Sequence, residues 1–249
     1  MNRNRAMFLA DWKDALFIHL QIDPQFLGRV VPFELDLRDG HAFVSLVAFT
    51  QSHLRPTIGG KLAAWLSAPL AEHEFLNLRA YVRVNGEPAI YFISEWIPNR
   101  LATLIGPRLY GLPYHMASLR YRNIPDGNPM QGRIFAPGGS LAYRATIDPR
   151  AALASAKPGT LDHFLLERYT AYTHRNGVSR KFNVDHAPWL QTRASAELTE
   201  ASLLSSNGGW SKSAQIVGAN YSPGVKDVAI GRPEICCPKT VAATPASPL

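Results

Sequence analysis

Cysteine is nearly absent from the sequence. Cys236 and Cys237 are the only two in 249 residues, and they are adjacent near the C-terminal end. Two adjacent cysteines cannot build a disulfide framework, and their spacing does not match a zinc site. We therefore expect a reducing, cytoplasmic compartment rather than a disulfide-rich secreted domain.

Long apolar runs are missing as well. The apolar residues that follow Arg3 and Arg5 are interrupted by Asp11, Lys13 and Asp14, so no signal-peptide core forms. No segment approaches the roughly 20 apolar residues of a membrane-spanning helix. We expect no membrane partner.

Most familiar catalytic and cofactor signatures do not occur. The sequence has no glycine-rich phosphate loop, no serine elbow, no histidine pair at helical metal spacing and no close carboxylate pair within one predicted strand. Its eight histidines are far apart, so a metal site would need ligands from several elements. We predict no cofactor and no metal site.

The sequence is basic, but its positive charge is dispersed. The formal net charge is +7, with 26 arginines and lysines spread singly along the chain. A nucleic-acid surface would gather them in a stripe or run, so a nucleic-acid partner is not favoured. Arginine outnumbers lysine and suits bidentate pairing with carboxylates, which makes a small acidic ligand plausible; the alternative is that these arginines pair with surface acids.

Period-two alternation of apolar residues predicts a strand-rich domain. Leu16 to Ile22 alternates in this way, and the clearest hairpin runs from Leu76 to Val84, turns at Asn85 and Gly86, and returns from Ala89 to Glu95. Further strands are predicted over residues 33–37, 43–49, 116–122, 132–136, 141–147, 180–185 and 189–196.

Short helices are predicted between the strands. Asp23 caps one, and Pro98 opens another that Pro107 ends together with Gly111 and Pro113. A third follows Pro158 with one face that extends from Leu161 to Tyr172. Strands interrupted by scattered helices indicate an α+β fold rather than an alternating parallel sheet.

The length fits one domain. A single core can serve a strand-rich chain of this size, and we predict one domain over residues 1–235. The tail over residues 236–249 is rich in Pro, Ala, Thr and Ser and is predicted to be disordered.

Six ordered motifs resemble a known family. They read FLADWKDALFIHLQIDPQFL, FLNLRAYVRVNG, FISEWIPNRLA, YGLPY, FLLERYTAY and VDHAPW, and they extend from Phe8 to about Ile235. Together they resemble the uncharacterised bacterial YqjF-like family, which is distantly similar in fold to acetoacetate decarboxylase. The resemblance implies a bent antiparallel sheet that forms a cone-like barrel around an interior pocket, with helices outside.

The catalytic lysines of acetoacetate decarboxylases are replaced here. In those enzymes a glutamate is followed by a proline and two lysines, of which the first forms a Schiff base. Glu95 and Pro98 match the glutamate and the proline, but Asn99 and Arg100 occupy the lysine positions. An amide is no nucleophile and a guanidinium supplies no neutral amine, so this mechanism is excluded at that position. Arg100 is kept as a candidate for binding a substrate carboxylate.

The resemblance implies that the polar face of the clearest hairpin lines the pocket. Asn77 and Arg79 lie on that face, opposite its leucines and valines. We name Arg79 as the leading anchor for an acidic group and add Asn77, Tyr114 and Arg120 as ligand-binding candidates. The alternatives are a solvated strand face for the first pair and an exposed basic ladder for Arg120.

Glu95 and His115 are the candidates for acid–base chemistry. Glu95 closes an apolar strand next to Trp96, and such surroundings raise the pKa of a carboxyl group. The alternative is an ionised glutamate paired with an arginine such as Arg79 or Arg120. His115 lies in a proline-bounded turn, and imidazole is suited to carrying protons near neutral pH.

A last group of residues carries the resemblance without an expected chemical role. We predict that these residues act as packing and hydrogen-bond anchors: Glu167, Arg168, Tyr169, His186 and Trp189.

The preferred function is that of a cavity protein that binds a small acidic or carbonyl-bearing metabolite. The first alternative is a lyase or hydrolase that works without a Schiff base and uses Glu95 and His115. The second is a nucleic-acid or protein-binding module that uses the net positive charge. The sequence does not indicate the oligomeric state.

Overall fold

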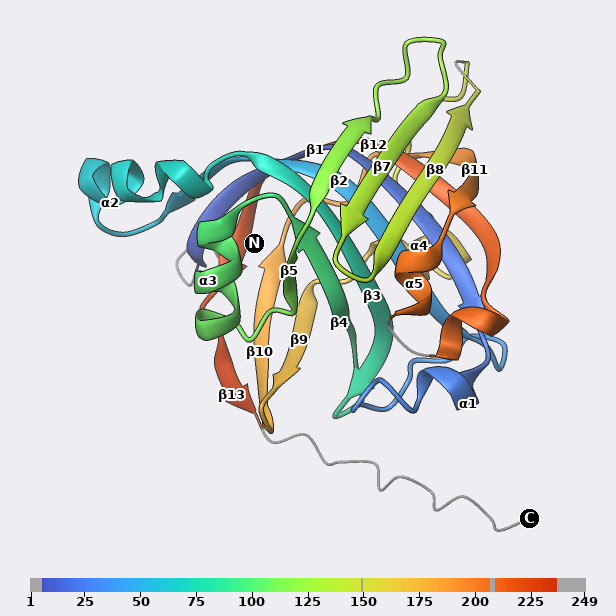
Figure 1. Cartoon of the computed structure of the whole chain (residues 1–249), viewed down its shortest axis with the longest axis horizontal. Coiled ribbons are helices and arrows are strands. Elements are labelled where there is room, and N and C mark those ends of the chain that lie inside the picture. Colours follow the sequence, from blue (N-terminus) through green and yellow to red (C-terminus); the bar gives the residue numbers. More distant parts are fainter. Residues whose placement is uncertain (1–5, 149, 207–208, 237–249) are drawn as a thin grey trace.

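The computed structural model describes residues 6–148, 150–206 and 209–236. Its main feature is one 13-stranded sheet accompanied by short helices (Figure 1). The strands are β1 Ala6–Ile22, β2 Ala42–Pro56, β3 His73–Val84, β4 Glu87–Ile97, β5 Tyr114–Met116, β6 Ser118–Arg122, β7 Met130–Ala136, β8 Gly139–Ile147, β9 Thr170–Arg175, β10 Val178–Asp185, β11 Thr192–Glu200, β12 Gln215–Gly231 and β13 Glu234–Cys236. The helices are α1 Pro24–Leu27, α2 Gly60–Ser67, α3 Arg100–Leu109, α4 Leu161–Leu166 and α5 Ser202–Ser205, with 3₁₀ turns at η2 Ala68–Leu70 and η3 Gly209–Ser213.

Part of the sheet closes on itself. The hydrogen-bonded order β10-β9-β4-β3-β2-β1-β12 is completed by a pairing between β10 and β12, which joins Val184 to Ile230 and Asp185 to Ala229. Most neighbours are antiparallel, but β4 pairs in parallel with β5 and β9. The arrangement is ring-like without being a true barrel, and we call these seven strands the ring.

Four of the remaining strands extend from β12 and cover one side of the ring, while β5 pairs with β4 and β13 with β10. We call β11, β8, β7 and β6 the outer branch; Figure 1 shows β7 and β8 in front of the ring. Leu16 and Ile18 of β1 and Leu78 of β3 share a buried core with Ile134 and Leu141 of this branch. The opposite faces of β1 and β3 therefore point to the interior of the ring, because side chains alternate along a strand.

The α+β, strand-rich class and the clearest hairpin are confirmed. Asn85 and Gly86 have φ of 53° and 84°, the left-handed pair that a tight hairpin turn requires. The strands predicted over 132–136 and 141–147 correspond to β7 and β8. Asp23 caps α1 by accepting a hydrogen bond from the backbone N–H of Gln25 at 2.8 Å.

Helix α3 ends at Leu109, within the stretch from Pro107 to Pro113 that was predicted to end it. Two local predictions are wrong. Residues 33–37 form no regular strand and contribute one isolated bridge, from Leu35 to Val82. The helix after Pro158 ends at Leu166, because the following residues pair with β4 and β10 as β9. Pairing in the sheet thus overrides a local helical period.

Strand β12 was not predicted, although it lies at the centre of the sheet between β1 and β11. Its sequence contains Pro223 and Gly224, which usually mark a turn. Gly224 has φ of 118°, and a Cβ atom there would overlap the carbonyl oxygen of Trp12. The glycine is needed for close approach of two strands rather than for a turn.

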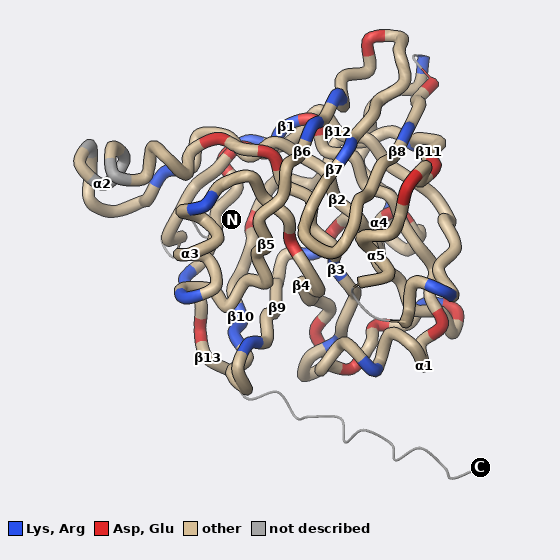
Figure 2. The backbone as a smooth tube through the Cα atoms, in the orientation of Figure 1, with Lys and Arg blue, Asp and Glu red and all other residues tan. Residues whose placement is uncertain are grey.

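The charged residues are dispersed over the fold, as the sequence indicated. Figure 2 shows basic and acidic residues on many separate elements. In the described part of the chain, no helix is both long and apolar enough to cross a membrane. Cys236 belongs to β13, and the rest of the predicted tail, together with Cys237, lies outside the described residues.

Candidate functional site

A cavity of about 160 Å³ lies in the interior of the ring. Most of its wall is aromatic or aliphatic, with contributions from β1, β2, β3, β4, β9, β10, β12 and α3. Ile105 of α3 belongs to the wall and is 39% exposed, so the cavity approaches the surface beside this helix. An engineered apolar cavity of about 150 Å³ accommodates benzene, which sets the scale of a fitting molecule.

One strand supplies a polar row to this wall. His73, Phe75, Asn77 and Arg79 alternate along β3, and all four line the cavity. Glu95 lies directly opposite Asn77 on β4 and lines it too. The prediction that the polar hairpin face turns toward a cavity rather than toward solvent is therefore confirmed.

Arg79 is a buried cation without a carboxylate partner among the described residues. The residue is 7% exposed, and it donates one hydrogen bond, from Nη2 to the Leu165 carbonyl oxygen at 2.8 Å. Its Nε has no hydrogen-bond partner. The guanidinium lies 5.5 Å from the Phe17 ring centre and 5.8 Å from that of Tyr81, which gives partial compensation by cation–π attraction.

Arg168, a second buried arginine of the cavity wall, is paired. Its Nη1 lies 2.7 Å from Asp36 Oδ2, and both side chains are 4% exposed. It also donates from Nε to the Phe164 carbonyl oxygen at 2.8 Å. The contrast with Arg79 shows that the fold compensates one of these charges internally and leaves the other facing the cavity.

Glu95 is a buried carboxyl group at the same wall. The residue is 4% exposed, and its Oε2 has no hydrogen-bond partner. Burial raises the pKa of Glu95 to about 8. The alternative of an ionised glutamate paired with Arg79 or Arg120 is wrong, because Glu95 makes no ion pair among the described residues. It is mostly protonated at neutral pH and can donate a hydrogen bond.

His73 is a wall residue that sequence reasoning missed. Its ring packs on Phe75 with centres 4.7 Å apart, and neither ring nitrogen has a hydrogen-bond partner. Burial lowers the pKa of His73 to about 4, so the ring is neutral. Continuing the two-residue spacing from Arg79 and Asn77 back through Phe75 would have found it.

Tyr114, a predicted ligand-binding residue, belongs to the cavity wall. It pairs with Glu95 along β4 and β5, and its ring meets that of Phe75 at 5.9 Å. Burial, and then the neighbouring Glu95, raise the pKa of Tyr114. Gly106 of α3 allows this arrangement, because a Cβ atom there would overlap the tyrosine ring.

Three predicted site residues lie outside the cavity. His115 pairs with Trp96, one position after Tyr114 and Glu95, so alternation turns it away from the cavity, and it is exposed. Arg120 is exposed opposite Arg133 on the outer branch, in agreement with the basic-ladder alternative. Arg100 is an exposed residue in the first turn of α3.

Asn99 caps a helix instead of facing the cavity. Its Oδ1 accepts from the Ala102 backbone N–H at 3.0 Å, and its Nδ2 donates to the Pro69 carbonyl oxygen at 2.7 Å. The position that carries the nucleophilic lysine in the decarboxylase pattern thus has a structural role here.

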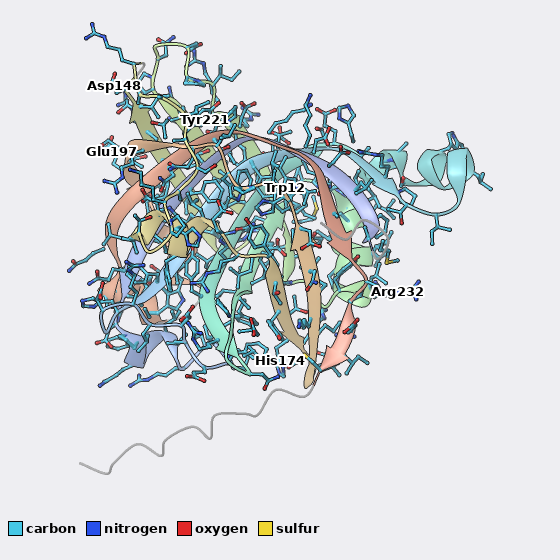
Figure 3. All side chains as sticks on the ribbon, turned by 180° about the vertical axis from the view of Figure 1, so that it is seen from behind. Trp12, Asp148, His174, Glu197, Tyr221 and Arg232 are labelled. Carbon is cyan, nitrogen blue, oxygen red and sulfur yellow. The ribbon has the colours of Figure 1, made fainter. Side chains whose placement is uncertain are left out.

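The predicted anchor residues form a connected cluster beside the cavity. Glu167 accepts from the Tyr169 hydroxyl and from the Trp189 backbone N–H. The ring of His186 packs 4.9 Å from Tyr169 and 5.1 Å from Trp189. Trp189 stacks on Trp12, which Figure 3 shows among the side chains that fill the middle of the molecule.

The anchor cluster also contributes to the cavity. Arg168, His186 and Trp189 belong to its wall, so these residues both pack the interior and shape the cavity. The sequence predicted that Trp189 belongs to a strand over residues 189–196. This is wrong, because Trp189 lies between β10 and β11. Within the described residues, no three His, Cys, Asp or Glu side chains are placed to hold a metal ion.

Comparison with known proteins identifies the family. The model of family DUF2071, described as an uncharacterized conserved protein, matches residues 9–226. The chain belongs to this family. A curated relative, the uncharacterized protein YqjF of Bacillus subtilis strain 168, is 32% identical over 204 residues, which are 79% of this chain and 80% of that protein. The prediction from the six motifs is confirmed.

Solved structures show what fold this DUF2071 chain has. Acetoacetate decarboxylase from Legionella pneumophila matches with a TM-score of 0.62 at 12% identity over 93% of this chain and 88% of that one. An acetoacetate decarboxylase-like enzyme from Sphingomonas wittichii matches with a TM-score of 0.58 at 19% identity over 93% and 94%. The enduracididine biosynthesis enzyme MppR, complexed with pyruvate, gives 0.61 at 11% over 92% and 89%. The fold is that of acetoacetate decarboxylase.

Proposed function

We propose that this protein binds a small carboxylate, such as an acidic or carbonyl-bearing metabolite, in the cavity with Arg79 as the anchor. The observation that carries the proposal is the buried guanidinium of Arg79, which faces the cavity without a carboxylate partner among the described residues. Burying an unpaired charge is costly, and an anion that enters the cavity would remove that cost.

The other polar groups of the wall support the same proposal. Asn77 Oδ1, Glu95 Oε2 and both ring nitrogens of His73 are buried without hydrogen-bond partners. Native proteins satisfy the large majority of such atoms, so a cluster of unsatisfied ones at one cavity suggests a ligand or ordered water. The mixture of an apolar wall and a few convergent polar groups is typical of small-molecule sites.

The size and the relatives are compatible with a small acid. Butyrate has as many non-hydrogen atoms as benzene, and the 160 Å³ cavity is on the scale that holds benzene. A structural neighbour has been solved with pyruvate, a carboxylate of similar size. At 11% identity that neighbour supplies an example of the fold with an acid bound, and the ligand of this chain is a proposal.

Glu95 also keeps an enzymatic function open. A carboxyl group whose pKa is raised to about 8 by burial is suited to donating or accepting a proton near neutral pH. Because His115 faces away from the cavity, a lyase or hydrolase would have to rely on Glu95 without it. A Schiff base is not part of this alternative, and borohydride reduction with acetoacetate should leave every lysine unmodified.

Ligand-induced thermal shifts test the binding proposal. A small acid such as butyrate or pyruvate should raise the melting temperature of the wild type, and Arg79→Ala should abolish the shift. Arg120→Ala is the matched control, because it removes an exposed arginine outside the cavity. Equal shifts in Arg79→Ala and the wild type would remove Arg79 as the anchor.

A further inference from the structure

Asn77 and Glu95 form a pair at the cavity wall. They are directly opposite in the antiparallel pairing of β3 with β4, where Cα atoms are about 4.5–5.5 Å apart. Both residues are more than nine-tenths buried, and both line the cavity. Asn77 Oδ1 and Glu95 Oε2 have no hydrogen-bond partner. Two such atoms on adjacent strands form one recognition point rather than two isolated defects.

The pair offers one donor and one acceptor at neutral pH. Glu95 is protonated in most molecules, because burial raises its pKa to about 8, so its carboxyl group can donate through the hydroxyl. The Asn77 amide presents an acceptor beside it. A ligand carboxylate placed against Glu95 could accept a hydrogen bond from it only while Glu95 keeps its proton. An uncharged group with an acceptor next to a donor fits both partners.

We propose that Asn77 and Glu95 recognise a carboxamide, on the same ligand whose carboxylate binds Arg79. The carboxamide oxygen accepts from the Glu95 hydroxyl, and its N–H donates to Asn77 Oδ1. The contact between the ligand carboxylate and Arg79 rests on the proposed function, whereas the contacts with Asn77 and Glu95 concern a separate part of the wall. The ligand class is therefore a short acid with a terminal amide.

The strand geometry sets the length of that ligand. Arg79 and Asn77 are alternate residues of β3, so their Cα atoms are about 6.6 Å apart at a rise of about 3.3 Å per residue. Groups at the two ends of a short acid can meet both side chains. Succinamate, a four-carbon acid with a terminal carboxamide, is the probe that follows from this spacing.

Calorimetric titration of two probes tests the proposal. Isocaproate has the shape and the number of non-hydrogen atoms of succinamate, but its distal end is apolar. At about pH 7 succinamate should bind the wild type at least about tenfold more tightly, since two hydrogen bonds distinguish the probes. Asn77→Leu should weaken succinamate and leave isocaproate unchanged.

A second readout isolates Glu95. Raising the pH from about 7 to about 9 should remove the preference for succinamate in the wild type and preserve it in Glu95→Gln, whose amide still donates. Burial raises the tyrosine pKa values and lowers the histidine ones, so these groups keep their charge over this interval. The titratable and charged groups that share the wall with Glu95 are His73, Arg79, Tyr110, Tyr114, Arg168 and His186.

The outcomes separate the two proposals. If isocaproate binds the wild type but not Arg79→Met, and succinamate binds no better, the carboxamide site is overturned while the anion site stands. If neither probe binds, both are overturned. A preference for succinamate that survives Asn77→Leu, or that ignores pH in the wild type, would contradict the assignment to Asn77 and Glu95.

Discussion

Arg79 and Arg168 are both buried at the cavity wall, yet their charges are balanced differently. Arg168 has Asp36 at 2.7 Å, whereas Arg79 has one carbonyl oxygen and two aromatic rings. Removing Arg168 takes from the buried Asp36 one of its two arginine partners, whereas removing Arg79 takes no partner from any buried carboxylate of the described residues. At the scale of single residues, we therefore expect Arg168 to contribute mainly to stability and Arg79 mainly to ligand binding.

Arg79→Met should leave the free energy of unfolding within about 1 kcal/mol of the wild-type value while it abolishes binding of small acids. Arg168→Met, the matched control, should cost about 1.5–3 kcal/mol because it removes one of the two arginine partners of the buried Asp36 and leaves Arg83 as the other. Urea unfolding measures both. A larger loss at Arg79 than at Arg168 would contradict the assignment of structural and binding roles.

Glu95 makes stability depend on pH in a defined direction. Its pKa is 4.5 in the unfolded chain and about 8 when folded, so the folded state binds more protons between these values. Stability from this group is fully present below pH 4.5 and is lost as the pH rises toward 8. Glu95→Gln should therefore gain on the wild type by about 1.4 kcal/mol per pH unit across this window.

Urea unfolding of both proteins at about pH 5 and about pH 8 tests this dependence. Glu197→Gln serves as the control, because Glu197 is an exposed glutamate of β11. It should follow the wild type at both pH values. A constant difference between Glu95→Gln and the wild type would show that Glu95 does not hold its proton when folded.

At the scale of elements, the start of α3 carries a helix cap at the position where the decarboxylase pattern has its nucleophilic lysine. Asn99 joins the start of α3 to the Pro69 carbonyl oxygen, and its side chain is not part of the cavity wall. The first turn of α3 thus carries a cap where the resemblance placed a nucleophile.

Asn99→Lys should lower the free energy of unfolding by about 1 kcal/mol through loss of the cap. It should also fail to form a borohydride-reducible adduct with acetoacetate, which mass spectrometry detects. Arg100→Ala controls for the change in charge at the neighbouring exposed position. A trapped adduct on residue 99 would show that the start of α3 can reach the cavity.

Sequence reasoning succeeded where one strand face has one environment. The alternation around Asn77 and Arg79 correctly predicted a polar row opposite a core face, but the analysed run began at Leu76 and so omitted His73. It failed at His115, where a single residue step reverses the direction of the side chain. Burial at the ends of short strands depends on which neighbours pair, and local patterns do not contain that information.

Larger features were harder to predict for the same reason. The Pro223–Gly224 pair suggests a turn, and only contact with Trp12 turns it into part of a long strand. The helical period after Leu161 was correct for one turn and a half before pairing with β4 took over. The family resemblance supplied the ring-like architecture, which periodicity alone did not.

At the scale of the whole molecule, the cavity depends on how the ring closes. The seam between β10 and β12 has two registered residue pairs, whereas β1 and β2 pair along most of their length. Few cross-strand hydrogen bonds make this seam less protected than the β1–β2 pairing, and the parallel β4–β9 pairing, with two registered residue pairs, is equally short. A ligand that bridges opposite walls would be expected to stabilise it.

Hydrogen exchange should show faster amide exchange at Asp185, Ala229 and Ile230 than along the β1–β2 pairing. Binding of a small acid should slow exchange at the seam in the wild type and not in Arg79→Met. Equal protection of the seam and of the β1–β2 pairing before binding would contradict the proposed weak point.

The most direct test of the central claim is a crystal structure with saturating butyrate. The carboxylate should lie in the cavity with its oxygen atoms about 2.7–2.9 Å from the guanidinium nitrogens of Arg79, the distance of a charge-assisted hydrogen bond. Butyrate bound only at surface arginines, or turned so that its alkyl chain meets Arg79, would contradict the account.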